Sequence, residues 1–168
     1  MSDYLMHPRK VLLGAQAASG MLPVCDHYCG VEARMLKSLR LQADMAEEFG
    51  ACVFDVTLDC EDGAPVGGEL AHAGLVANVA QSAFAQWRVA QSLGRALAKP
   101  RVAVRVHPVA HPAFEQDIKV IVGMVGADLC HIMIPKVESQ ADVEVAISAI
   151  DQAMPDGAKD RLPLHVLI

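Results

Sequence analysis

Residues 53–65 of the chain, VFDVTLDCEDGAP, run from an apolar strand pattern into a group of carboxylates. Successive side chains of a β-strand point to opposite faces, so Phe54, Val56 and Leu58 share one face. The opposite face carries polar residues, namely Asp55, Thr57, Asp59 and Glu61. Because buried anionic groups are costly unless they meet cations or a metal, this pattern predicts a site at the carboxyl end of the strand.

Strand-like and helix-like segments alternate along the rest of the chain. A short helix is expected first, at residues 11–18. Strands are expected at residues 21–26, 52–59, 101–107, 129–134 and 164–168. Helices are expected at residues 32–49, 75–97, 112–125 and 140–154, with Gly50 ending the first and Ser139 capping the last. Residues 63–74 contain four glycines and a proline and are expected to form a long loop.

This alternation predicts an α/β fold whose strands are all parallel. No glycine-rich phosphate-binding motif follows any expected strand, so a dinucleotide-binding fold has no support. A flavodoxin-like sheet and part of a (β/α)8 TIM barrel remain. We favour the barrel, because the sequence ends on an apolar strand. A whole barrel needs about 250 residues. The chain is therefore expected to be a single domain, 1–168, that supplies the first five strands and four helices, with the C-terminal strands missing.

Composition limits the classes of partner. Of the 168 residues, 53% are hydrophobic and only 4% are aromatic, and such aliphatic content suits a sheet that is buried on both faces. The net charge is −6 and the basic residues are scattered, which argues against nucleic-acid partners and against an anionic membrane surface. No apolar run approaches the ~20 residues that span a bilayer.

Cysteine usage and the first residues predict a cytoplasmic protein. The five cysteines are an odd number without paired metal-type spacing. Cys52, Cys60 and Cys130 lie in or beside expected strands, where a reduced thiol packs as a small apolar residue. Cys25 and Cys29 have the spacing of a redox or metal pair, but the sequence offers no further ligands nearby, so we interpret them as packing residues too. The start of the chain lacks the apolar segment of a secretory signal.

Two further strand ends carry reactive side chains. In residues 101–108, RVAVRVHP, the valines share one face and the arginines share the other, so Arg105 is expected inside a barrel. A buried arginine must be paired, and the carboxylates of the neighbouring strand are the expected partners, either as a structural ion pair or as part of a site. Lys136 follows the next strand, and it can bind an anionic substrate or pair with a strand carboxylate. His107 and His111 are interpreted as ordinary polar loop residues.

Three motifs in this order resemble the HpcH/HpaI aldolase and citrate lyase β-subunit-like family. Its members carry D-L-E-D-A-V-P, V-R-V-N-P and L-P-K-V-E-S segments. The corresponding segments here are DCEDGAP at residues 59–65, VRVHP at 104–108 and IPKVES at 134–139. The resemblance covers the chain from about Asp26 onward.

The resemblance implies a Mg²⁺-dependent (β/α)8 enzyme, a homotrimer or homohexamer, that cleaves or forms a C–C bond in a small carboxylate or an acyl-CoA thioester. Arg105 would hold the substrate carbonyl and carboxylate and stabilise an enolate, with Lys136 as a second substrate-binding residue. Glu61 and Asp62 would position substrate and metal-bound water or serve the proton transfers. The family's own magnesium ligands follow its fifth and sixth strands, so they are expected beyond Ile168.

Two departures from the family pattern leave the activity open. The first strand end reads CDHYCG at residues 25–30 where the family has F-V-P-G, which leaves the substrate open because this loop helps to shape the pocket. The expected metal ligands are not among these 168 residues. Beside a citrate lyase β or acyl-CoA lyase activity, a class II pyruvate-type aldolase without CoA and a catalytically silent fragment or assembly module therefore remain as alternatives.

Overall fold

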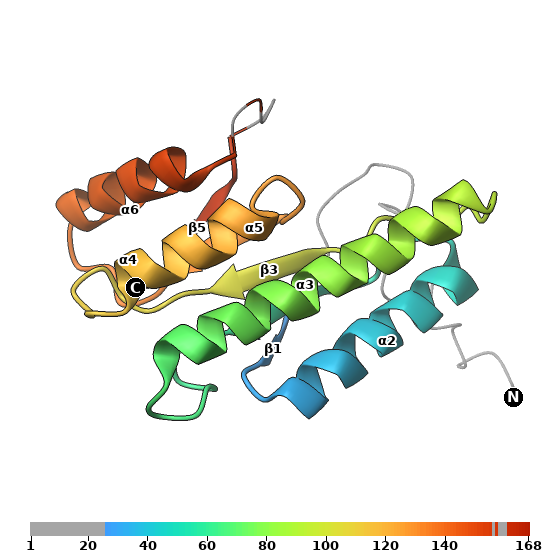
Figure 1. Cartoon of the computed structure of the whole chain (residues 1–168), viewed down its shortest axis with the longest axis horizontal. Helices are drawn as coiled ribbons and strands as arrows, with labels where there is room; N and C mark the ends of the chain where they lie inside the picture. The colour runs from blue at the N-terminus through green and yellow to red at the C-terminus, as the bar shows by residue number, and fades with distance from the viewer. Residues whose placement is uncertain (1–25, 156, 158–160) are drawn as a thin grey trace, which may run out of the picture.

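The computed structural model describes residues 26–155, 157 and 161–168. The expected helix at 11–18 and most of the expected strand at 21–26 lie outside these residues. The described chain forms one sheet, and its helices lie together in a layer on one side of it (Figure 1). No described helix has the length and hydropathy that crossing a membrane would require.

The sheet has five strands in the order β1-β2-β3-β4-β5, and every neighbouring pair is parallel. The strands are β1 (Asp26–Cys29), β2 (Asp55–Asp59), β3 (Val102–Arg105), β4 (His131–Ile134) and β5 (Leu164–Val166). A flavodoxin-like sheet would have the order 2-1-3-4-5. Strands that follow one another in space as they do in the chain form instead the wall of a (β/α)8 barrel. The expected partial barrel, with five parallel strands and four helices, is confirmed.

Helix α2 (Glu32–Phe49) matches its expected bounds, and Gly50 ends it with φ 68, a left-handed conformation that favours glycine. Helix α3 (Glu69–Ser92) begins six residues earlier than the expected residue 75, so the loop before it is shorter than expected. Gly67 and Gly68 have positive φ just before the helix, whereas Gly74 lies inside it. The glycine content of this segment made the expected loop too long.

The third helical segment is continuous but not uniform. It consists of α4 (Phe114–Asp117), a π-helical turn η2 (Ile118–Val122) and α5 (Gly123–Val125). Helix α6 (Gln140–Ala153) is capped, as expected, by Ser139, which forms a capping box with Asp142. Each of these helices leads the chain back to the next parallel strand.

The first strand differs from its expected position. It occupies Asp26–Cys29 rather than residues 21–26, so DHYC is a strand and not the loop after one. The strand lacks an apolar sequence pattern, because its polar side chains have partners inside the barrel and need not be replaced by apolar ones. The Thr57 hydroxyl, for example, donates to the Asp26 carboxylate at 2.8 Å.

The hydrophobic core lies between the sheet and the helices. Its strand residues are fully buried: Val56, Leu58, Val102, Val104, Ile132 and Ile134. They meet Phe84 of α3 together with Phe114 and Ile121 of the third helical segment. Each such side chain contributes about 1.5–3 kcal/mol when it leaves water. This packing turns the alternate residues of every strand, most of them polar, toward the barrel interior.

Candidate active site

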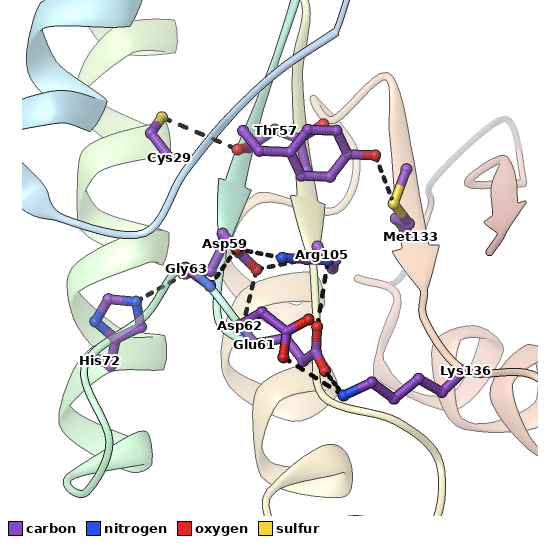
Figure 2. A network of polar contacts seen from close by, with 11 residues as sticks. Cys29, Thr57, Asp59, Glu61, Asp62, Gly63, His72, Arg105, Met133 and Lys136 are labelled. Atoms are coloured by element: carbon purple, nitrogen blue, oxygen red, sulfur yellow. Dashed lines mark hydrogen bonds and ion pairs between the residues drawn. The ribbon is translucent and has the colours of Figure 1, made fainter. Parts of the chain in front are cut away.

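The three polar motifs meet at the carboxyl ends of β2, β3 and β4 (Figure 2). In the register of the sheet, Asp59 of β2 pairs with Arg105 of β3. Both residues point to the inner face, because their neighbours along the strands are buried under the helices. The contact between Arg105 and the acidic strand end that the sequence predicts is therefore present.

Arg105 is held by two parallel hydrogen bonds to Asp59. Its Nε donates to Oδ1 at 2.8 Å and its Nη2 donates to Oδ2 at 2.6 Å. The same carboxylate accepts the backbone N–H groups of Glu61 at 2.9 Å and Gly63 at 2.8 Å. Asp59 is thus saturated with four donors while its side chain is only 1% exposed. Its role is to fix the plane and direction of the guanidinium.

Burial opposes the charge of Asp59, but the hydrogen bonds from Arg105 and from the two backbone N–H groups outweigh it. The pKa of Asp59 is therefore lowered from its ordinary value. The same pairing raises the pKa of Arg105. Both groups are charged at neutral pH, so the pair is a fixed dipole and not a proton donor.

Glu61 lies between the two cations of the site. Its Oε2 lies 3.2 Å from Nη1 of Arg105, and its Oε1 forms an ion pair with Lys136. The Glu61 side chain is 5% exposed, and Oε2 has no hydrogen bond despite its closeness to Arg105. A buried carboxylate oxygen without a donor can accept a proton or a hydrogen bond from a bound molecule.

Asp62 and Lys136 form the exposed rim. Nζ of Lys136 lies 3.4 Å from Oδ1 of Asp62, and both side chains are more than half exposed. Lys136 has φ 54, the one positive φ among the described non-glycine residues. This left-handed conformation costs about 1–2 kcal/mol. Hydrogen bonding to Glu61 raises the pKa of Lys136. Of the two roles expected for Lys136, the structure shows the pairing with carboxylates, here those of Glu61 and Asp62.

Tyr28 of β1 is a site residue that sequence reasoning missed. Its ring lies 5.2 Å from Cζ of Arg105, within the range of a cation–π contact, and its hydroxyl donates to the sulfur of Met133 at 2.9 Å. The contacts reach from β1 to β4 across the interior. They were missed because Tyr28 was expected in a loop, where no inward direction can be assigned.

His107 also differs from its interpretation as an ordinary polar loop residue. It is 9% exposed, and its Nδ1 lies 2.6 Å from Oδ2 of Asp117, which also accepts the His107 backbone N–H at 3.0 Å. The ring stacks on His111 with 4.2 Å between centroids. Asp117 is fully buried in α4, and its Oδ1 has no partner. The loop after β3 is therefore anchored by a buried His–Asp pair.

Comparison with solved structures shows which proteins the chain is similar to. The chain is similar to a citrate lyase from Burkholderia xenovorans LB400, with 35% sequence identity and a TM-score of 0.70 over 88% of this chain. The match confirms the resemblance to citrate lyase β-like proteins. The chain spans 41% of the length of that citrate lyase. No protein-family model matches the chain, and no curated protein matches it.

The citrate lyase β-like resemblance implies Mg²⁺, and the described residues at this end of the sheet do not form a magnesium cage. Mg²⁺ requires near-octahedral oxygen ligands. Both oxygens of Asp59 are occupied by donors, and Glu61 and Asp62 face the cations Arg105 and Lys136. Three carboxylates against two cations leave a single negative charge, too little to attract a divalent ion strongly. Direct ligands for Mg²⁺ would have to come from other residues.

Proposed function

We propose that this chain is part of a magnesium-dependent carbon–carbon lyase of the citrate lyase β or acyl-CoA lyase type. Its substrate would be a hydroxyacyl-CoA or a hydroxy acid, cleaved by retro-aldol or retro-Claisen chemistry. Residues 1–168 would form the N-terminal part of the barrel, Mg²⁺ would be bound by ligands outside this chain, and the complete protein would be a homotrimer or homohexamer. The observation that carries the proposal is the fixed guanidinium of Arg105 at the carboxyl ends of the strands.

Retro-aldol cleavage breaks the bond between a hydroxyl-bearing carbon and the α-carbon of a carbonyl group. A base takes the hydroxyl proton, the hydroxyl carbon becomes a carbonyl, and the bonding electrons move to the α-carbon and the carbonyl oxygen as an enolate. A proton then adds to the α-carbon. The barrier falls most when donors are aimed in advance at the oxygen where charge develops.

Arg105 fits this task because only part of it is occupied. Asp59 takes Nε and Nη2, whereas Nη1 points toward Glu61 and the mouth of the sheet. A substrate oxygen that reaches Nη1 would meet a donor that is already oriented. Two hydrogen bonds to Asp59, whose carboxylate is itself held by two backbone N–H groups, keep the guanidinium in place, so little reorganisation is needed during the reaction.

Glu61 and Lys136 supply the remaining parts of the proposal. Oε2 of Glu61 is buried and lacks a hydrogen bond, so it is placed to accept a proton or to hold a water molecule. Lys136 is exposed and can turn from Glu61 toward a substrate carboxylate or phosphate. Asp62, at 67% exposure, would act on solvent-side water only.

The test is an assay of two substrate panels in the presence of Mg²⁺, namely 3-hydroxyacyl-CoA thioesters and 2-keto-4-hydroxy acids. Cleavage of the thioesters supports the lyase, and cleavage of the keto acids alone supports the class II pyruvate-type aldolase. Calorimetry with Mg²⁺ tests the third alternative, a catalytically silent fragment or assembly module. Binding by a longer polypeptide but not by the 168 residues would indicate that ligands lie outside this chain. Absence of binding and turnover in both would favour a silent assembly module.

A further inference from the structure

A second polar cluster lies at the opposite end of the strands from the candidate active site. It consists of Asp55 at the start of β2 and of Cys130 and His131 at the start of β4. One donor atom from each residue lies within 4.8 Å of the other two, and no other His, Cys, Asp or Glu cluster in the described part of the chain meets this limit. Between the two strands, Ala103 pairs with His131 and presents only a methyl group.

The distance between Cys130 and His131 is that of two ligands on one metal ion. Sγ of Cys130 lies 3.5 Å from Nδ1 of His131. With Zn–S of about 2.3 Å, Zn–N of about 2.0–2.1 Å and a tetrahedral angle, the two donor atoms would be about 3.5 Å apart. The separation in the structure equals this value.

The other nitrogen of His131 also has the surroundings of a metal-bound imidazole. Nε2 is buried without a hydrogen-bond partner, and Oδ2 of Asp26 lies 3.9 Å away. A histidine that binds a metal through one nitrogen usually donates the other N–H to a carboxylate. Asp26 of β1 is placed to receive it after a small movement.

The charges at this end leave room for a cation. Asp26 and Asp55 carry two negative charges, and Arg101 compensates one of them through hydrogen bonds of 2.5 and 2.9 Å to Asp55. Each carboxylate oxygen keeps a further lone pair for a metal. A divalent ion would release the thiol proton to solvent, and the thiolate and the remaining carboxylate charge would balance it.

We propose that Asp55, Cys130 and His131 form a zinc-type metal site at the amino ends of the strands, with water in the fourth position and Asp26 as the partner of the imidazole. Thiolate and imidazole ligands select Zn²⁺ over Mg²⁺. The site would tie β2 to β4 across β3, and it is independent of the lyase proposal because no residue is shared.

Cobalt is the probe, since Co²⁺ takes the place of Zn²⁺ and a thiolate ligand gives it a charge-transfer absorption. The purified protein is stripped with a chelator and titrated with Co²⁺ in excess Mg²⁺. The expected result is one bound ion, a charge-transfer band and about one proton released per ion. Cys130→Ser should abolish the band, and Asp26→Asn should weaken binding about 10–100-fold. Cys52→Ser is the control, because this nearby thiol bonds the Phe54 carbonyl and lies outside the cluster.

A wild-type protein without the band, or a band that survives Cys130→Ser, would overturn the site. X-ray absorption on the zinc-loaded wild type covers the case in which a variant fails to fold. One sulfur at about 2.3 Å with nitrogen or oxygen at about 2.0–2.1 Å is expected. A shell of oxygen alone would show that Cys130 and His131 form only a thiol–imidazole hydrogen bond.

Discussion

The two ends of the sheet contain the same ion pair in different surroundings. Arg105 binds Asp59 at the carboxyl end, and Arg101 binds Asp55 at the amino end, each through Nε and Nη2. The first pair is deeper, because the Arg105 side chain is 13% exposed and that of Arg101 is 27% exposed. At the carboxyl end the neighbours are further charged groups. At the amino end, the side-chain amide of Gln42 in α2 donates to the backbone carbonyls of Phe54 and Arg101, at 2.8 and 2.9 Å.

This difference shows that a buried arginine–carboxylate pair is not by itself a catalytic feature. What distinguishes Arg105 is its place at the carboxyl end of a parallel sheet, where barrel enzymes have their sites, with its Nη1 beside the buried carboxylate of Glu61. Matched substitutions at the two ends test whether the two ion pairs differ in this way.

The largest expected effect is on stability. Asp59→Asn removes the charge that compensates Arg105 and should lower the free energy of unfolding by about 3–5 kcal/mol. Asp55→Asn should cost only about 1–2 kcal/mol, because water reaches Arg101 more easily. Urea unfolding of the purified variants measures both values. Equal losses at the two ends would contradict the difference in burial.

The next effect concerns rate. Arg105→Lys should lower kcat about a hundredfold or more, about 2.7 kcal/mol, because a point charge cannot replace an oriented planar donor at a developing enolate. Arg101→Lys makes the same change at the amino end and should leave kcat within about threefold. Steady-state kinetics on the substrate that the panel identifies separates them. Intact turnover in Arg105→Lys would reduce its ion pair to a structural role.

A smaller effect appears in acid. The pKa of Asp59 is lower in the folded chain than in the unfolded chain, where a carboxyl titrates near about 3.9. As the pH falls, the unfolded chain therefore binds a proton at Asp59 before the folded chain does. The stabilisation is complete above about pH 5 and is lost as pH falls through the folded pKa. Unfolding measured between about pH 2 and pH 6 should show a shallower decline in stability for Asp59→Asn than for the wild type. Identical slopes would mean that the fold does not stabilise the charged form of Asp59.

The smallest expected change is at the rim. Lys136→Met removes an exposed cation and should leave the urea midpoint unchanged. If Lys136 binds the substrate's anionic group, KM rises roughly threefold to tenfold while kcat changes little. Lys119→Met, an exposed lysine on η2, is the matched control. A KM that does not respond would leave Lys136 as a partner of Glu61 only.

The sequence by itself determined the layer architecture and the direction of the main site residues. The alternation of elements predicted parallel strands, Gly50 and Ser139 marked helix ends, and the period of two placed Arg105 opposite its valine neighbours. These features depend on backbone conformation and on which face is apolar, and both are local properties that a sequence pattern records.

Only the tertiary structure decided how deeply each site residue is buried and which residues it contacts. Strand register places Asp59, not Glu61, opposite Arg105, and it brings Tyr28 and Met133 together across the interior. From the sequence, Cys130 was interpreted only as a small apolar packing residue, yet the fold places it beside Asp55 and His131. The period of a strand fixes the side to which a residue points. The stagger between strands fixes what it meets there, and that stagger results from the packing of the whole barrel wall.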